Sequence, residues 1–181
     1  MKKFIIALAL MLGVSGVANA SIMFEPYLGY ETGKFSDPDG KGDGVNIGAR
    51  LAYHTPIMLW LGLDGNLGIS GNFKPDSGSV ANSDMKRNSL YGVVGIDLPV
   101  LLRAWAGYAF MDDQKLDSPH NSTLKNKTYK VGVGFTGLPF ISLNVEYIKA
   151  KVDKVDGGSL TGADDIQSEN VMFSVSLPLN F

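Results

Sequence analysis

The most telling absences in this 181-residue sequence are those of cysteine and of excess positive charge. No cysteine is present, so the chain forms no disulfide and offers no thiol for lipid attachment. Sixteen Lys and Arg residues stand against 18 Asp and Glu, a balance that argues against a nucleic-acid partner. Charged residues make up 19%, below the roughly 25% of ordinary globular domains. The fold must be stable without cross-links, and it carries little charge for a water-exposed surface.

Long apolar runs are also scarce, and the one at the N-terminus has the form of a secretory signal. Lys2 and Lys3 precede an apolar segment that ends at Val14, and Ala18-Asn19-Ala20 supplies the small residues that signal peptidase requires. The segment is far shorter than the roughly 20 residues of a membrane-spanning helix. We therefore expect residues 1–20 to be cleaved as a signal peptide. Removing 20 of the 181 residues leaves a single domain of 161, residues 21–181.

What the sequence has in abundance is glycine, with 22 residues, and strict alternation of apolar and polar side chains. The clearest case is the C-terminal segment from Val171 to Phe181, in which every second residue is apolar and the last is aromatic. Period-two alternation indicates a strand with one apolar and one polar face. About ten such residues are enough to cross a hydrocarbon layer at a tilt of about 45°.

The same alternation predicts eight strands along the chain, near residues 23–34, 44–54, 57–70, 87–97, 100–111, 127–137, 140–151 and 168–181. Three connections are short and contain proline, at 54–56, 97–99 and 137–139, whereas four are long and polar, at 35–43, 71–86, 112–126 and 152–167. Proline cannot donate to a strand ladder, so it marks strand ends. The pattern predicts an all-β, eight-stranded antiparallel up-and-down transmembrane barrel with both termini at the short-turn end.

The composition of the two faces indicates which one points inward. The polar face is rich in glycine, which suits a narrow interior: Gly29, Gly33, Gly48, Gly62, Gly68, Gly95, Gly107, Gly132 and Gly134. The other face is aliphatic at mid-strand and is expected to contact lipid. Aromatic residues form two predicted belts at its boundaries, an upper one of Tyr30, Tyr108, Tyr129, Tyr147 and Phe173 and a lower one of Phe24, Tyr53 and Phe181.

With its opening strand Glu25-Pro26-Tyr27-Leu28-Gly29-Tyr30, its glycine-rich interior face, its four polar loops and its terminal Phe181, the chain resembles the small eight-stranded outer-membrane barrels that include the OmpA transmembrane domain and the OmpX/Ail proteins. The resemblance implies the outer membrane of a Gram-negative bacterium, with periplasmic N- and C-termini. It also implies Phe181 as the assembly signal read by the outer-membrane assembly machinery, with periplasmic chaperones, membrane lipid and lipopolysaccharide as further partners. A monomer is expected, with no nucleic acid and an unknown loop ligand.

Seven charged residues fall on the predicted interior face: Glu25, Glu31, Arg50, Asp64, Arg103, Lys130 and Glu146. Unpaired charge in a narrow interior is costly, so we expect these side chains to form a paired network. Lys130 and Glu146 are each eight residues from Leu138, which predicts that they stand opposite each other on neighbouring strands. Arg50 is expected near Glu25. The network suits either a static polar plug or the salt-bridge gate of a narrow ion-conducting barrel.

Catalytic and metal-binding patterns are weak. His54 falls in a short turn, and His120-Asn121-Ser122 gives a His-x-Ser pattern in the middle of a polar loop, whereas a nucleophile and its base need rigid support. The aspartates at 36–43 and 162–165 lack the spacing of a calcium loop. We therefore predict no catalytic, cofactor-binding or metal-binding residues. The sequence favours a non-enzymatic barrel with a structural or adhesin-like role through its four loops; a lipid A acyl hydrolase or transferase and a narrow channel are the alternatives.

Overall fold

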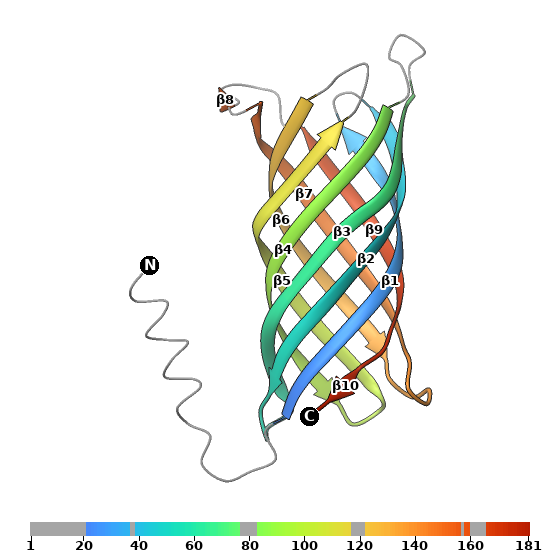
Figure 1. Ribbon diagram of the computed structural model, residues 1–181, viewed down its shortest axis with the longest axis vertical. Helices are drawn as coiled ribbons and strands as arrows, with labels where there is room; N and C mark the ends of the chain where they lie inside the picture. Colours follow the sequence, from blue (N-terminus) through green and yellow to red (C-terminus); the bar gives the residue numbers. More distant parts are fainter. Residues whose placement is uncertain (1–20, 37–38, 77–82, 117–121, 157, 160–165) are drawn as a thin grey trace.

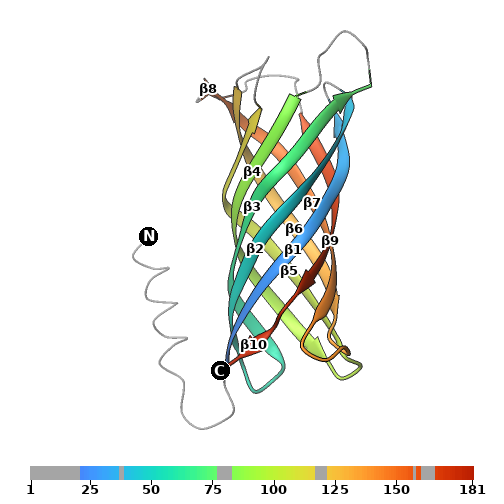
Figure 2. The same ribbon diagram turned by 45° about the vertical axis from the view of Figure 1, so that its right-hand side comes forward.

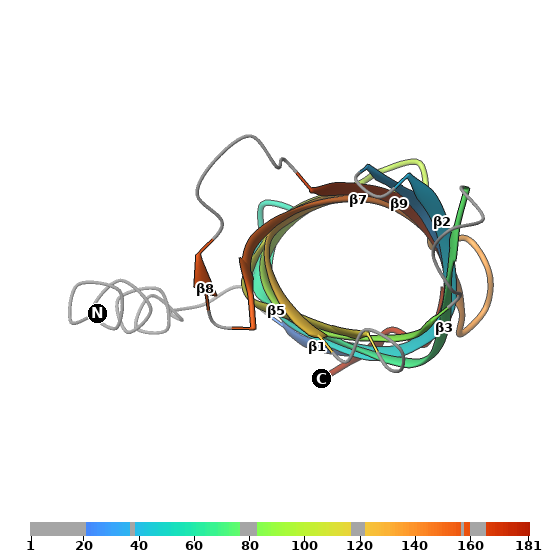
Figure 3. The same ribbon diagram turned by 90° about the horizontal axis from the view of Figure 1, so that it is seen from above.

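The computed structural model describes residues 21–36, 39–76, 83–116, 122–156, 158–159 and 166–181, which form one closed antiparallel barrel (Figure 1). Seven strands follow one another, and each pairs with the next: β1 (Ser21–Ser36), β2 (Gly40–His54), β3 (Leu59–Pro75), β4 (Ser83–Leu98), β5 (Leu102–Leu116), β6 (Ser122–Phe135) and β7 (Ser142–Val155). The eighth, β9 (Gln167–Ser176), pairs with both β7 and β1 and closes the ring seen in Figure 3. The prediction of an eight-stranded up-and-down barrel is confirmed. Residues 1–20, the expected signal peptide, lie outside the described residues.

The C-terminal strand differs from the prediction because it is interrupted. β9 ends at Ser176, and after Leu177 and Pro178 the chain continues as the short strand β10 (Leu179–Asn180), which pairs with β1 (Figure 2). Ser176 pairs with Ser142, the first residue of β7, so the residues after Ser176 extend beyond the end of β7. Phe181 is still held to β1, because its backbone exchanges hydrogen bonds of 2.9 and 3.1 Å with Ile22.

Three of the four predicted long loops are largely strand. β1 and β2 together cover all but 37–39 of the loop predicted at 35–43, β3 and β4 extend into 71–86, and β5 and β6 extend into 112–126. The apolar alternation ends where the lipid ends, whereas backbone pairing needs only N–H and C=O groups and continues beyond it. The fourth connection contains the two-residue strand β8 (Gly158–Ser159), which pairs with the end of β7.

The short turns lie at the opposite end of the barrel, at 55–58, 99–101 and 136–141. Each contains one bulky residue with positive φ: Met58 (65°), Leu101 (59°) and Phe140 (66°). The last turn corrects a predicted register. Phe135 pairs with Leu143, so the turn is centred on Pro139 and not on Leu138. Glu146 consequently stands opposite Gly132, two residues from the predicted partner Lys130. A two-residue shift keeps both charged side chains on the inward face.

The outer face is apolar and exposed between the two ends, and its upper aromatic residues are neighbours across the strands. Tyr30 pairs with Phe173, and Tyr108 pairs with Tyr129, all with exposed side chains. The inner face is packed by aromatic residues that lie over cross-strand glycines. A Cβ atom on Gly95 would lie 2.3 Å from the Trp60 ring, and one on Gly132 would lie 2.4 Å from Trp105. These glycines are therefore what lets two tryptophans fit inside so narrow a barrel. Among the described residues, no helix is long and apolar enough to cross a membrane.

Candidate functional site

The interior contains two groups of charged side chains, and the larger one is centred on Arg50 of β2. The Arg50 guanidinium donates hydrogen bonds to carboxylates from three other strands, at 3.1 Å to Glu25, 2.9 Å to Asp64 and 2.9 Å to Glu146. Arg50 is 2% exposed and the three acids at most 1%. Arginine suits this position, because its planar fork carries five N–H donors and satisfies several carboxylates at once.

Two more cations complete this group. Lys130 of β6 bonds to Asp64 at 2.8 Å and to Glu146 at 3.0 Å, and Arg103 of β5 bonds to Glu25. Three acids and three bases therefore balance, and each acid contacts two of the cations. We call Glu25, Arg50, Asp64, Arg103, Lys130 and Glu146 the lower network.

Neutral groups provide further hydrogen bonds to the lower network, although Arg103 Nε has no hydrogen-bond partner among the described residues. Tyr27 donates a hydrogen bond of 2.8 Å to Asp64, Trp105 donates one of 2.8 Å to Glu146, and Ser176 donates one of 2.5 Å to Glu25. The Arg50 guanidinium also lies 4.4 Å from the centre of the Trp105 ring, within the range of a cation–π interaction. Buried ions are tolerated when they are paired and hydrogen-bonded in this way, so the geometry is that of a closed polar plug.

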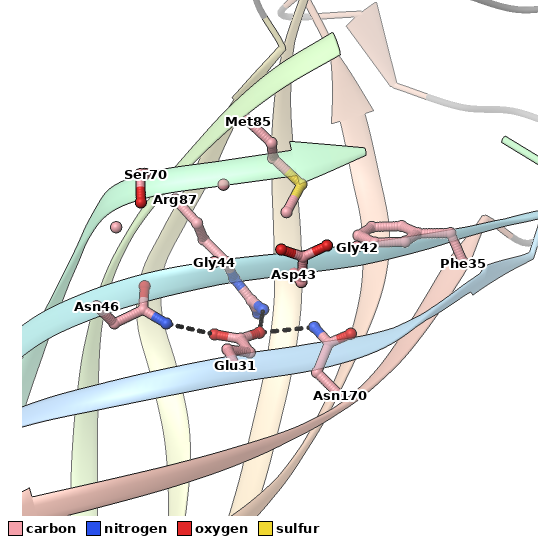
Figure 4. Close-up of a pocket in the computed structure, with 12 residues that line it drawn as sticks. Glu31, Phe35, Gly42, Asp43, Gly44, Asn46, Ser70, Met85, Arg87 and Asn170 are labelled. Atoms are coloured by element: carbon pink, nitrogen blue, oxygen red, sulfur yellow. Dashed lines mark hydrogen bonds and ion pairs between the residues drawn. The ribbon is translucent and has the colours of Figure 1, made fainter. Parts of the chain in front are cut away.

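The smaller group lies nearer the loop end of the barrel. Arg87 of β4 contacts Asp112 of β5 at 2.6 Å and Glu31 of β1 at 3.0 Å, and Thr128 also donates a hydrogen bond to Asp112. In Figure 4, Glu31 is contacted by Arg87, Asn46 and Asn170. The side-chain amides of Asn46 and Asn170 donate hydrogen bonds of 3.1 and 2.7 Å to the Glu31 carboxylate. We call Glu31, Arg87 and Asp112 the upper cluster. A hollow of about 20 Å³ adjoins it, room for roughly one water molecule.

The seven interior charges that the sequence suggested are thus divided between two places. Six of them form the lower network, and Glu31 belongs to the upper cluster. Glu25 and Arg50 are direct cross-strand partners. The contact between Lys130 and Glu146 exists, but as a diagonal contact and not as the directly opposed pair that was predicted.

Sequence reasoning missed Arg87 and Asp112, and for Asp112 the cause is a bulge. Tyr91 pairs with Ala109 and Leu90 with Met111, so Phe110 is an extra residue in β5. Arg103, Trp105 and Ala109 are buried below it, whereas Asp112 and Gln114 are buried above it. A bulge exchanges the two faces of a strand, so simple alternation from Arg103 would have placed Asp113 inside. Arg87 could have been predicted to face inward, since it lies two residues before the buried Ser89 and four residues before the buried Tyr91.

The outer surface of the loop end carries a row of lysines on neighbouring strands. Lys34 of β1 pairs directly with Lys41 of β2, which in turn pairs with Lys74 of β3. All three side chains are exposed, and no ion pair is found for any of them within the described ranges. Like charges placed directly opposite each other destabilise a sheet. We call Lys34, Lys41 and Lys74 the lysine row.

Among the residues considered for catalysis that the structure describes, His54 and Ser122 lie at opposite ends of the barrel. His54 Nδ1 lies 3.0 Å from a carboxylate oxygen of Asp97, and the His54 ring stacks on Trp60, both at the short-turn end. Ser122 begins β6 at the loop end, and His120 lies outside the described residues. The aspartates at 162–165 also fall outside them. Within the part of the chain that the structure describes, no group of three or more acidic, histidine or cysteine side chains could hold a metal ion.

Comparison with known proteins agrees with this architecture. The family of outer membrane protein beta-barrel domains matches residues 4–181, and the chain belongs to that family. Its members are barrels of the Gram-negative outer membrane. No curated protein matches the chain in sequence.

Three solved structures, of two proteins, share the fold at low sequence identity. Neisserial surface protein A is 17% identical with a TM-score of 0.56, and the match covers 88% of this chain and 99% of that one. Ail, the attachment invasion locus protein of Yersinia pestis, is 14% identical with a TM-score of 0.54, covering 87% and 98%. Ail in complex with the heparin analogue sucrose octasulfate gives 12% identity and a TM-score of 0.55, covering 90% and 100%. These similarities establish the small outer-membrane barrel fold.

Proposed function

We propose that this protein is a non-enzymatic surface-interaction barrel whose loop end binds phosphate or sulfate groups on glycans. In this proposal the short-turn end and both termini face the periplasm, and the extended strand ends carry the contacts in place of long loops. Lipopolysaccharide in the same membrane and sulfated polysaccharide on another surface are the two sources of such groups. Phe181 remains our proposed signal for the assembly machinery.

The observation that carries the proposal is the lysine row. Its three lysines are direct cross-strand neighbours on β1, β2 and β3, and their side chains are exposed. Their mutual repulsion is relieved when an anion with several charges bridges them, and such contacts are charge-assisted hydrogen bonds. The binding energy would therefore come partly from repulsion already present in the free protein.

The contrast with neighbouring lysines supports this choice. Lys127 is paired with Asp153 at 2.6 Å and Lys149 with Glu169 at 2.7 Å on the β6–β7 side. Those two lysines form ion pairs, whereas none is found for the lysine row among the described residues, although Lys34 stands directly opposite Glu169, the partner of Lys149. Ail, a barrel of the same fold, has been solved in complex with the heparin analogue sucrose octasulfate, which is support by analogy of fold.

The interior supports a structural use of the lumen. The lower network crosses the barrel from β1, β2 and β3 to β5, β6 and β7, and its side chains are almost fully buried. An ion passing this level would have to displace paired charges. For this reason we favour a plug over a channel and place the activity on the outer surface.

The proposal is tested by replacing Lys34, Lys41 and Lys74 together with glutamine. Binding of the folded barrel is measured against vesicles containing lipopolysaccharide and, separately, against a sulfated heparin oligosaccharide. We expect the triple variant to lose roughly tenfold or more in affinity for one of the two, with a shallower dependence on salt. The double variant Lys127→Gln with Lys149→Gln is the matched control and should bind nearly as well as wild type.

The two arms separate the sources, because loss confined to lipopolysaccharide identifies the membrane's own glycan and loss confined to heparin identifies an external one. Equal affinity of the triple variant and wild type in both arms would refute the proposal.

A further inference from the structure

The short-turn end of the barrel exposes more apolar surface than a turn in water should. Ile57 is 71% exposed, Val100 is 66% exposed and Phe140 is 88% exposed, one in each of the three turns. No side chain of residues 55–58, 99–101 or 136–141 is charged. His54 and Asp97, just outside the first two turns, lie 3.0 Å apart. Each turn contains a proline and the third also contains Gly137, but none contains the asparagine, aspartate or serine that is common in turns facing water.

The backbone of the same turns is strained in a way that keeps apolar side chains at their tips. Met58, Leu101 and Phe140 all have positive φ, a conformation that glycine and asparagine adopt at low cost and bulky residues do not. Within the described residues, the only other non-glycine residue of this kind is Asp156, at the loop end. An ordinary polar turn would thus avoid strain at three positions. The sequence instead keeps a large apolar residue at each.

The height of the apolar band indicates what these residues contact. On β6 the outward apolar residues run from Phe135 to Tyr129, and the next outward residue, Lys127, is charged and exposed. Those six steps span about 15 Å, at a rise of about 3.3 Å per residue and a tilt of about 40°. Leu143 to Tyr147 on β7 gives only about 10 Å by the same measure. The apolar band of outer-membrane barrels is about 25 Å tall, a height that β3 reaches from Leu59 to Ile69 by the same measure but that β6 and β7 do not reach.

We propose that the three short turns are part of the lipid-facing surface and lie within the membrane leaflet on that side, with phospholipid as their partner. The missing height on β6 and β7 is then supplied by Leu138 and Phe140. The surface is continuous with the apolar wall, because Leu59, Leu102 and Phe135 begin or end the adjoining strands and are exposed. This inference concerns the end of the barrel opposite the lysine row and does not depend on the glycan proposal.

The first test uses the absence of cysteine, which makes single-site labelling clean. Ile57→Cys and Val100→Cys, each carrying a nitroxide, are placed in the full barrel in phosphatidylcholine vesicles. Collision rates with oxygen, which concentrates in lipid, and with a nickel chelate, which stays in water, are compared with two reference sites. Val145→Cys marks the lipid-facing wall and Lys115→Cys marks water.

We expect the oxygen-to-nickel ratio at Ile57 and Val100 to lie nearer that of Val145 than that of Lys115. A ratio nearer that of Lys115 would show turns standing in water, free for a soluble partner, and would overturn the proposal.

The second test compares two opposite effects on stability, namely the relief of backbone strain and the cost of placing a polar amide in lipid. Leu101→Asn and Phe140→Asn relieve the backbone strain, so in water they should stabilise the barrel or leave it unchanged. In lipid the free-energy cost of burying the asparagine amide exceeds the backbone strain energy that is relieved. We therefore expect the folded-to-unfolded ratio in vesicles to fall by roughly tenfold or more. Asp156→Asn, with positive φ at the loop end, is the matched control and should change that ratio less than about twofold. A rise in stability of both turn variants would contradict lipid contact.

Discussion

The two groups of charges inside the barrel are built differently. In the lower network three acids meet three bases, and two tryptophans lie against Arg50. In the upper cluster one arginine serves two acids, and a hollow large enough for about one water adjoins it. The lower network is neutral and closed, whereas the upper cluster carries a formal excess of negative charge and lies toward the loop end. The comparison teaches that charge inside a barrel is tolerated by balanced pairing in the lower network and, in the upper cluster, by pairing beside a hollow that adjoins Glu31 and Arg87.

Breaking the lower network at its centre should have the largest effect. Arg50→Met removes the partner of Glu25, Asp64 and Glu146 at once and leaves three buried acids with two cations. We expect the free energy of unfolding to fall by about 3–5 kcal/mol, the usual cost of stranding a buried charge. Urea titration followed by the heat-dependent gel shift of the folded barrel measures it. A loss under about 1 kcal/mol would mean that the network is hydrated.

The contact between Lys130 and Glu146 tests the same buried pairing through the coupling free energy of a double-mutant cycle. Lys130→Met and Glu146→Gln should each destabilise the barrel by roughly 2–4 kcal/mol, because each leaves an unbalanced charge. The double variant restores neutrality, so its loss should be smaller than the sum by about 1–3 kcal/mol. Combining Lys130→Met with Lys149→Gln on the outer face is the control, and those losses should add. Additive losses for the inner pair would refute their contact.

The upper cluster should be more forgiving. Arg87→Gln keeps a hydrogen-bond donor near Asp112 and Glu31 but removes the charge. We expect a loss of about 1–3 kcal/mol, smaller than that of Arg50→Met, because Glu31 lines the adjoining hollow and can be solvated there, although Asp112 stays buried. The same urea titration compares the two variants directly. If Arg87→Gln proved the more damaging, the distinction between a dry and a water-accessible group would fail.

The smallest effect is expected from the exposed pair of Lys127 and Asp153, beyond the aromatic belt. The hydrogen bond from Lys127 lowers the pKa of Asp153 below its ordinary value. The pair's contribution is therefore present above the unfolded pKa of about 4 and is lost as the pH falls through the lower folded value. Asp153→Asn should leave the midpoint of urea unfolding at pH 7 nearly unchanged. Between pH 5 and 3, the midpoint of the variant should fall slightly less than that of wild type. A pronounced drop at pH 7 would contradict a merely solvated pair.

The barrel itself could be predicted because its signals are local. Alternation along β1 or β9 shows directly which side chains share a face, and the prolines at 56, 99 and 139 mark the short turns. Composition then separates the glycine-rich interior from the aliphatic exterior. Each of these inferences needs only neighbouring residues, and each points to the same fold.

What could not be predicted depends on pairing between strands. The extra residue Phe110 and the turn centred on Pro139 are set by how two strands fit together, and either one changes which charges meet. Strand ends beyond the lipid lose the apolar signal that marked them, so the predicted loops were too long. The lysine row could not be predicted from the sequence either, because Lys34, Lys41 and Lys74 become neighbours only through the registers of three strands.

The inward position of both tryptophans has a practical consequence for spectroscopy. Trp60 and Trp105 are the chain's two indoles, they are 0% and 4% exposed, and both lie inside the barrel against Arg50. Their emission reports on the packing of the lumen and is shielded from the surrounding acyl chains. Intrinsic fluorescence of this protein is thus a gauge of whether its centre has closed, and it should stay constant when one bilayer is exchanged for another.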